Sequence, residues 1–311
     1  MPIAAKIAEK IIQEKLLAFS LENRLIPSTQ HGFVPGRSII TNMLQCLDHW
    51  TRSLDTNTPV DVVYLDFSRA FDRVPHNKLL HKLEHLGIRG KLLLWIEAFL
   101  TGRTFSVRVG DSFSSTHHVT SGVPQGSVLG PILFLLYTSD LPRQVSSMCS
   151  VYADDTKIFN TVTNSAELQE DLELVSCWSE RWSLPLNISK CCVLHLGKNN
   201  PRLNYKIADQ TLEAVSSHTD LGIKINDRLT WSEHIQHVTS KAKRLLYMME
   251  RSFKGCHMST CSFLYKSFVR PLLEFAGPVW DSVLVRDKNL LEAVQRRATP
   301  IPLVRHRPTY Y

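Results

Sequence analysis

Two neighbouring carboxylates, Asp154 and Asp155, stand between two short β-prone segments, Val151–Ala153 and Thr156–Phe159. This pattern predicts a tight hairpin with both acids at its tip. Ionised carboxylates side by side repel each other, so such a pair is stable only in water or beside a cation. A solvated turn is the usual explanation for an Asp-Asp pair taken alone. Hard divalent cations such as Mg²⁺ take oxygen ligands of this kind together with substrate phosphates, so the pair is a candidate metal site.

A second acidic position lies 88 residues before Asp154, at the end of a predicted strand. The segment 60–67 is apolar on both faces, which is typical of a central strand covered on two sides, and Asp66 stands near its end. If this strand pairs with the hairpin, Asp66 and Asp154 meet. Carboxylates from two adjacent strands can bridge two Mg²⁺ ions about 3.5–4 Å apart, the arrangement used for in-line phosphoryl transfer. One ion would activate a primer 3′-hydroxyl and the other would stabilise the leaving pyrophosphate.

Three segments in order, Tyr64–Asp72, Ser121–Pro131 and Tyr152–Asp155, resemble the successive core motifs of a reverse transcriptase. The Tyr-Ala-Asp-Asp and Pro-Gln-Gly-Ser forms are similar to those of non-LTR (LINE-type, jockey-like) retrotransposons. Weaker similarities lie in His31–Ser38, Asn187–Lys190 and Leu221–Ile223. The resemblance covers nearly the whole chain, and the order and spacing of the motifs are more specific than any one of them.

The resemblance implies a role for each matched residue. Asp66, Asp154 and Asp155 would be catalytic and would hold Mg²⁺, with Mn²⁺ as an alternative, and Lys190 would be catalytic by protonating the leaving pyrophosphate. The residues that would bind the substrate are Phe67, Phe71, Gln125 and Gly126. The ring of Phe71 would exclude a ribose 2′-hydroxyl and so favour deoxynucleotides. From the residues alone, Phe71 could equally be a core aromatic and Lys190 a solvated surface lysine.

The basic residues gather towards the C-terminal end. Residues 241–311 contain 13 Lys and Arg against 5 Asp and Glu, so their net charge is +8. The other residues carry a net charge of −1, which gives the total of +7. A basic segment beside an acidic catalytic region suits contact with a nucleic-acid backbone, although a solvated basic face has the same composition. The candidate nucleic-acid-binding residues are Arg37, Lys241, Lys243 and Arg244.

The seven cysteines indicate a reducing environment, because their number is odd and no CxxC pair occurs. We therefore expect an intracellular protein, in the nucleus or the cytoplasm, with no membrane partner. The longest apolar stretch, Val128–Tyr137, is too short to span a bilayer. Cys191, Cys192 and His195 lie close in sequence, but no second ligand pair stands at the spacing of a zinc finger.

The elements that must position these residues follow from hydrophobic spacing. Ile7, Ile11 and Leu16 predict a helix over 3–25 with one buried face, and Thr230-Trp231-Ser232-Glu233 predicts a capping box that opens a later helix. Strands near 191–197, 203–207 and 220–226 are expected to complete the palm and its primer-side edge. The other predicted elements are helices over 39–51, 77–101 and 165–182 and hairpins over 103–120, around Gly110-Asp111, and 149–160.

The resemblance implies an α+β fold of right-hand polymerase architecture, with an antiparallel palm sheet packed on helices, partial fingers and a helical thumb. Residues 1–58 would be partial fingers and palm entry helices, and residues 59–227 the palm, with a fingers insertion at about 76–119. Residues 228–311 would be the helical thumb and connection.

The function implied is that of an RNA-directed DNA polymerase of a non-LTR retrotransposon. Its partners would be an RNA template, a DNA primer and deoxynucleoside triphosphates, and the oligomeric state stays open. An alternative is a truncated, catalytically silent nucleic-acid-binding remnant, because the basic fingers segment of family members is not found ahead of the matched region. An RNA-dependent RNA polymerase shares the palm chemistry, but Phe71 argues against it.

Overall fold

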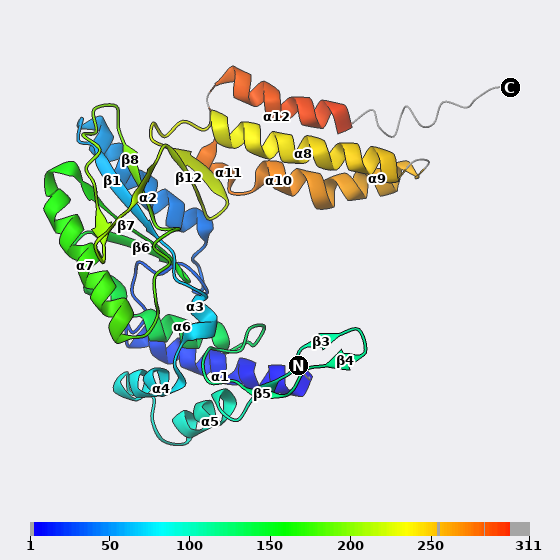
Figure 1. Cartoon of the computed structure of the whole chain (residues 1–311). Coiled ribbons are helices and arrows are strands. Elements are labelled where there is room, and N and C mark those ends of the chain that lie inside the picture. Colours follow the sequence, from blue (N-terminus) through cyan, green and yellow to red (C-terminus); the bar gives the residue numbers. More distant parts are fainter. Residues whose placement is uncertain (1–2, 254–255, 283, 299–311) are drawn as a thin grey trace. The chain divides into compact units, whose positions relative to one another are not determined.

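A five-stranded sheet organises the N-terminal two thirds of the chain in the computed structural model, which describes residues 3–253, 256–282 and 284–298. The chain divides into two compact units, Met1–Val215 and Ser216–Tyr311, shown with all their elements in Figure 1. The last part of the predicted thumb, residues 299–311, lies outside the described residues. The two units are described one at a time.

The main sheet of the first unit has the order β11-β8-β1-β7-β6. Strand β1 lies at its centre and all of its residues are buried, as expected for a strand with apolar residues on both faces. It pairs antiparallel with β7 and β8, and only β11 is parallel to its neighbour. The strands are β1 (Val60–Leu65), β6 (Met148–Tyr152), β7 (Asp155–Thr161), β8 (Cys192–Leu196) and β11 (Glu213–Val215).

Two helices pack against the main sheet through side chains that alternate along its strands. Helix α2 (Ile39–Asp55) places Trp50 against Phe159 of β7, with ring centroids 5.6 Å apart. Helix α7 (Ser165–Arg181) places Trp178 in the core cluster that contains Val63. Strand β1 is thereby covered on both faces, which fixes the direction in which the chain leaves it.

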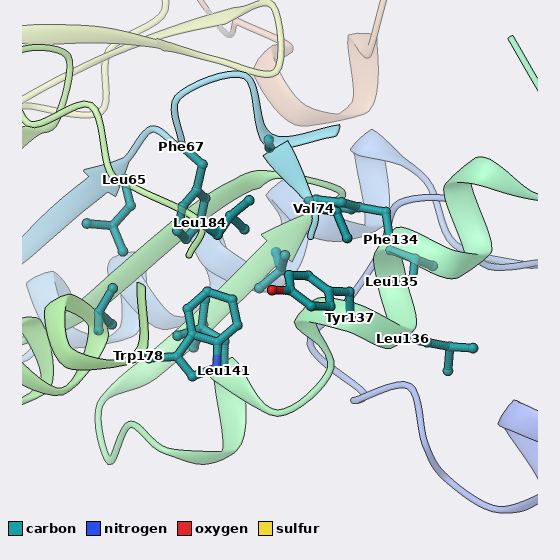
Figure 2. Packing of buried hydrophobic residues seen from close by; sticks show 14 of the residues in the cluster. Leu65, Phe67, Val74, Phe134, Leu135, Leu136, Tyr137, Leu141, Trp178 and Leu184 are labelled. Atoms are coloured by element: carbon teal, nitrogen blue, oxygen red, sulfur yellow. The ribbon is translucent and has the colours of Figure 1, made fainter. Parts of the chain in front are cut away.

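Helix α6 (Gly130–Thr138) is almost wholly buried and forms the centre of the core below the sheet. Figure 2 shows its Phe134 and Tyr137 in the same buried cluster as Phe67 and Trp178. An ion pair lies beside this aromatic group: Lys82 Nζ is 3.6 Å from the Trp182 ring centroid and 2.6 Å from Asp140 Oδ1, which also accepts from Trp178 Nε1 at 3.1 Å. Burial lowers the pKa of Lys82 to about 8, although the carboxylate of Asp140 acts in the opposite direction.

The rest of the first unit consists of short elements around this core. The helix predicted over 77–101 is in fact two helices, because Gly87 adopts a φ of +91° and ends the first of them. The hairpin predicted around Gly110-Asp111 is present as two short strand pairs. These helices and strands are α1 (Ile3–Glu22), α3 (Ala70–Arg73), α4 (His76–His85), α5 (Gly90–Leu100), β2 (Thr104–Phe105), β3 (Arg108–Val109), β4 (Ser112–Phe113), β5 (His117–His118), β9 (Lys206–Ile207), β10 (Gln210–Thr211) and the 3₁₀ turns Leu141–Arg143 and Val162–Asn164.

The second unit is a small hairpin joined to helices. The hairpin of β12 (Ser217–Asp220) and β13 (Ile223–Asn226) forms a sheet of its own, and β9 pairs with β10. Of the strands predicted near 191–197, 203–207 and 220–226, β8 is the one that joins the main sheet. The helix α8 that follows packs on β13 and carries the core side chains Ala242 and Leu246. The helices are α8 (Ser232–Ser252), α9 (Met258–Leu264), α10 (Arg270–Glu274), α11 (Gly277–Trp280) and α12 (Val285–Ala298), with a π turn at Tyr265–Val269.

The capping box predicted at residues 230–233 is not formed. Helix α8 begins at Ser232 after Trp231, which makes no side-chain cap. Thr230 Oγ1 instead accepts from Asn226 Nδ2 at 2.7 Å, and Glu233 Oε1 lies 2.5 Å from Lys224 Nζ. Both side chains are engaged by the preceding hairpin, which competes with local capping. Among the described helices, none has the length and apolar content needed to cross a membrane.

Candidate active site

The hairpin of β6 and β7 brings two acidic segments of the sequence to one place. Tyr152 pairs with Asp155, so Ala153 and Asp154 form the two-residue tip. On the other side of β7, Leu65 pairs with Thr156, and continuing this register by one residue brings Asp66 opposite Asp155. The predicted meeting of the strand end with the hairpin tip is therefore present in the fold.

The carboxylates at this place interact electrostatically. Asp154 is half-buried, and burial is the main reason why its pKa is raised, while the nearby charge of Asp66 raises it further. A hydrogen bond to its backbone acts in the opposite direction. Asp155 is exposed at the start of β7. The site thus holds negative charge at a cost that a bound cation would offset.

The donor set fits a hard divalent cation. The nearby charge of Asp66 contributes to the raised pKa of Asp154, so a cation between the two carboxylates would stabilise the ionised form, and Mg²⁺ needs only one or two protein carboxylates beside water and substrate phosphates. Within the described ranges, no three His, Cys, Asp or Glu side chains gather into a complete metal site. A cation held by Asp66 and Asp154 would take its other ligands from backbone oxygens, water or substrate.

Lys190 lies beside Asp66. Its Nζ is 3.7 Å from Asp66 Oδ2, and its side chain is 67% exposed. The turn that carries it is tied to the end of β1, because Asn187 N–H donates to the Asp66 carbonyl at 2.7 Å and Ser68 N–H donates to the Pro185 carbonyl at 2.8 Å. The backbone near this lysine is therefore tied to the end of β1, while the side chain that carries the ammonium group is largely exposed.

Phe71 lies in α3, just after the loop that follows β1. Its ring stacks on Phe134 of α6 at a centroid distance of 4.3 Å and meets the edge of Phe33 at 6.5 Å. Phe71 is half-buried, whereas Phe33 is exposed. The ring therefore packs on the core and also keeps an accessible side, and its role as a gate stays a prediction.

Two other predicted residues serve the fold in ways that the sequence did not indicate. Phe67 is 6% exposed and packs edge-on against Trp178 with centroids 6.0 Å apart, so its side chain belongs to the core and is not available to a substrate. Arg37 Nη1 donates to the carbonyls of Pro27 and Gln30 and thereby closes the loop before α2. The guanidinium of Arg37 is thus already engaged with protein backbone.

The glycine-rich loop before α6 is held against α3. Gln125 Nε2 donates to Asp72 Oδ1 at 2.8 Å, and Ser121 Oγ donates to the Asp72 carbonyl at 2.9 Å. Gly122 has a φ of +89°, and a Cβ there would lie 2.7 Å from the Asp72 carbonyl oxygen, so this close approach requires glycine. Gln125 and Gly126 remain exposed at the loop's surface, on a backbone that α3 positions.

Glu9 of α1 also supports this loop, a role that no sequence pattern indicated. Its Oε2 accepts from the N–H groups of Val128 and Leu129, at 2.8 and 3.3 Å, just before α6 begins. A buried carboxylate at this position satisfies amide groups that the helix cannot pair itself. The apolar face predicted for α1 is only partly buried, because Ile7 and Ile11 are exposed while Glu9 points inward.

Gln30 is a second residue that no sequence pattern indicated. It lies between the helices predicted over 3–25 and 39–51, and its side chain is buried against the tip of the β6–β7 hairpin. The single available signal was its place next to the His31–Ser38 motif. A buried glutamine cannot be distinguished from an exposed one by residue type.

The basic candidates of the second unit lie on α8. Lys241 and Arg244 are exposed and one turn apart, whereas Lys243 is half-buried on a different side of the helix. The neighbouring His237 has a lowered pKa, first because of desolvation and then because of the positive charges of Lys241, Lys224 and Arg244. This part of α8 therefore carries a positive potential.

Residues 1–260 match the protein family described as "Reverse transcriptase (RNA-dependent DNA polymerase)". The chain is 27% identical over 313 residues to a probable RNA-directed DNA polymerase from transposon BS of Drosophila melanogaster, with 94% of this chain and 34% of that protein covered. It is also 27% identical over 317 residues to the RNA-directed DNA polymerase from mobile element jockey of the same fly, with 96% and 34% covered. The chain thus spans about a third of the length of these relatives.

Solved structures with a similar fold are telomerases. An apo telomerase from Candida tropicalis superimposes with a TM-score of 0.52 at 12% identity, covering 97% of this chain and 55% of that one. A telomerase from Candida albicans in complex with a fragment of telomeric RNA gives 0.51 at 11% identity, covering 99% and 57%. At this level of identity, the likeness concerns the fold.

Proposed function

Because the chain belongs to the reverse transcriptase (RNA-dependent DNA polymerase) family, we propose that it copies an RNA template into DNA by transferring deoxynucleotides to the 3′-hydroxyl of a primer. The observation that carries this proposal is the meeting of Asp66, at the end of β1, with Asp154, at the tip of the β6–β7 hairpin. The relatives named after transposons and mobile elements support an origin in a non-LTR retrotransposon.

The proposed cation ligands are Asp66 and Asp154, with Asp155 in support. When bound, Mg²⁺ or Mn²⁺ would polarise substrate oxygens and neutralise charge in the transferred phosphoryl group. Lys190 would approach the leaving pyrophosphate and donate a proton to it, since its exposed ammonium group is anchored next to Asp66 only by an ion pair. That ion pair would weaken when a cation takes the place of the ammonium beside Asp66.

Substrate selection would fall to Phe71 and to the loop that carries Gln125 and Gly126. The stack of Phe71 on Phe134 holds the ring in place, so a ribose 2′-hydroxyl could not push it aside without loss of packing. This preference for deoxynucleotides is the reason to favour DNA synthesis over RNA synthesis. The loop is positioned by Asp72 and Glu9, and we assign it to the nucleotide and the template.

The nucleic-acid duplex would be bound in part by α8. Lys241 and Arg244 would contact phosphates, which supplies affinity without sequence preference. We keep the division into partial fingers, palm and thumb as part of the proposal. The structure groups residues 216–227 with the C-terminal helices, and so we begin the proposed thumb unit at Ser216.

Primer extension on an RNA template with Mg²⁺ and deoxynucleoside triphosphates tests the proposal. The wild-type chain should extend the primer, and Asp154→Asn should reduce the rate by at least about 100-fold, because several kcal/mol of charge stabilisation would be lost. The matched control is Asp111→Asn, which changes an exposed aspartate at another hairpin tip and should retain the wild-type rate. Extension that persists in Asp154→Asn would exclude this metal site, and no extension by any variant would favour a silent remnant.

A further inference from the structure

One buried side chain holds the tip of the β6–β7 hairpin. Gln30 is 3% exposed, and its Oε1 accepts from the Ala153 N–H at 2.9 Å and from the Gly32 N–H at 2.7 Å. Its Nε2 donates to the Ala153 carbonyl at 3.4 Å. A single amide group therefore pairs both backbone polar groups of the residue that precedes Asp154.

Ala153 needs this support because its backbone is left-handed, with a φ of +60°. For a residue that has a Cβ, this conformation costs about 1–2 kcal/mol, and it persists only where the surroundings determine it. The two hydrogen bonds between Gln30 and the Ala153 backbone, one accepted and one donated by the Gln30 amide, provide such surroundings. Since Ala153 and Asp154 share a peptide unit, a change at Ala153 would redirect the Asp154 side chain.

The backbone that carries Gln30 is itself fixed to the hairpin. Val151 N–H donates to the Thr29 carbonyl at 3.0 Å, and His31 N–H donates to the Val151 carbonyl at 2.8 Å. Gly32 lies so close that a Cβ there would be 2.5 Å from Ala153 N. Segment 29–32 is thus added alongside β6, and the amide of Gln30 cannot move independently of the strand.

We propose that Gln30 is a positioning residue that holds Ala153 in its left-handed conformation and thereby aims the Asp154 carboxylate at the cation. This inference rests on the proposed function, because it concerns the metal site of that function. The role requires an amide, which accepts from two N–H groups and donates to one carbonyl. Methionine preserves the length and offers neither group, while glutamate preserves the acceptors and lacks the donor.

Binding of Mn²⁺ alone to the full chain, followed by electron paramagnetic resonance without nucleic acid or nucleotide, tests this role separately from activity. Gln30→Met should raise the Mn²⁺ concentration at half-saturation by about tenfold or more, the usual effect of removing a group that orients a metal ligand. Gln30→Glu should fall between this variant and the wild type. Asp154→Asn removes a proposed ligand, so it shows the Mn²⁺ binding that remains when the site is lost.

Asn42→Leu is the matched control, because Asn42 is a fully buried amide that donates to Ser150 Oγ and to the Val151 carbonyl of the same hairpin. It should lower the melting temperature and leave the Mn²⁺ midpoint unchanged. An unchanged midpoint in both Gln30 variants, or an equal rise in Asn42→Leu, would overturn the proposal.

Wild-type protein without Asp154-dependent Mn²⁺ binding would refute the metal site and the role of Gln30 together. Normal Mn²⁺ binding without primer extension would refute only the proposed polymerase function.

Discussion

At the scale of single residues, the catalytic candidates could be predicted because their chemistry is visible in the sequence. Adjacent carboxylates, and a carboxylate that ends a buried strand, are unusual enough to suggest a cation. Their partners were not visible: Gln30 and Glu9 look like ordinary polar residues of a turn and a helix. Their roles depend on contacts with residues 123 and 119 positions away, which no local pattern encodes.

Phe71 gives a prediction at this scale. Phe71→Val should reduce the preference for deoxynucleotides over ribonucleotides by on the order of 10- to 100-fold, because the smaller side chain leaves room for a 2′-hydroxyl. The ratio of kcat/KM values for dNTP and rNTP incorporation measures this effect. Phe113→Ala, at an exposed aromatic of β4, should keep the wild-type ratio. An unchanged ratio in Phe71→Val would remove the proposed gate.

At the scale of elements, the prediction succeeded where periodicity was strong. The central strand β1, the β6–β7 hairpin and the buried stripe of α7 follow directly from the spacing of their apolar residues. It failed where tertiary partners intervene. Glu233 forms an ion pair with Lys224 of the β12–β13 hairpin, so it is not available to a capping box, and none forms. The α+β class is confirmed, and the right-hand polymerase architecture is the one shared with the telomerases.

The junction of this hairpin with α8 gives a pH prediction. His234 is buried against Trp280, its Nδ1 accepts from the Lys224 N–H at 3.1 Å, and burial lowers its pKa to about 4. Between this value and the ordinary value of 6.5, the unfolded chain binds more protons than the folded chain. The free energy of unfolding should therefore decrease as the pH falls from 6.5 to 4, by about 3 kcal/mol in total.

Urea unfolding across this pH range measures the effect. His234→Asn offers an acceptor in a comparable place and does not titrate, so the part of the acid sensitivity due to His234 should disappear in that variant. Identical pH profiles for the variant and the wild type would show that His234 does not control the acid stability of the unit.

At the scale of the whole molecule, charge is distributed unevenly along the chain. Residues 241–311 carry +8 and the rest carries −1, so the acidic catalytic segments and the basic segment are separate in sequence. The sequence indicated a basic region that could bind nucleic acid. The positions of its basic residues around α8 now separate those that share one face from those that do not. Lys241 and Arg244 share a face, and Lys243 does not.

This distribution predicts a salt-dependent affinity. Lys241→Glu combined with Arg244→Glu should weaken binding to an RNA–DNA duplex by at least about tenfold at moderate salt, and should make the plot of log K against log salt shallower by about 2. The control with the same change in net charge is Lys6→Glu combined with Lys198→Glu, at exposed positions of the first unit. If both pairs change the salt slope equally, total charge and not this face of α8 governs binding.

The carboxylate of Glu9 also sets a limit on how far this protein can be shortened. An engineered version that lacks residues 3–22 would keep every motif of the polymerase, yet the amides of Val128 and Leu129 would lose their acceptor. Leaving such groups without a partner costs about 1–3 kcal/mol each when they are buried, comparable to a large fraction of a domain's total stability. The first helix, remote in sequence from every catalytic candidate, is therefore part of the smallest piece that we expect to keep the loop before α6 rigid.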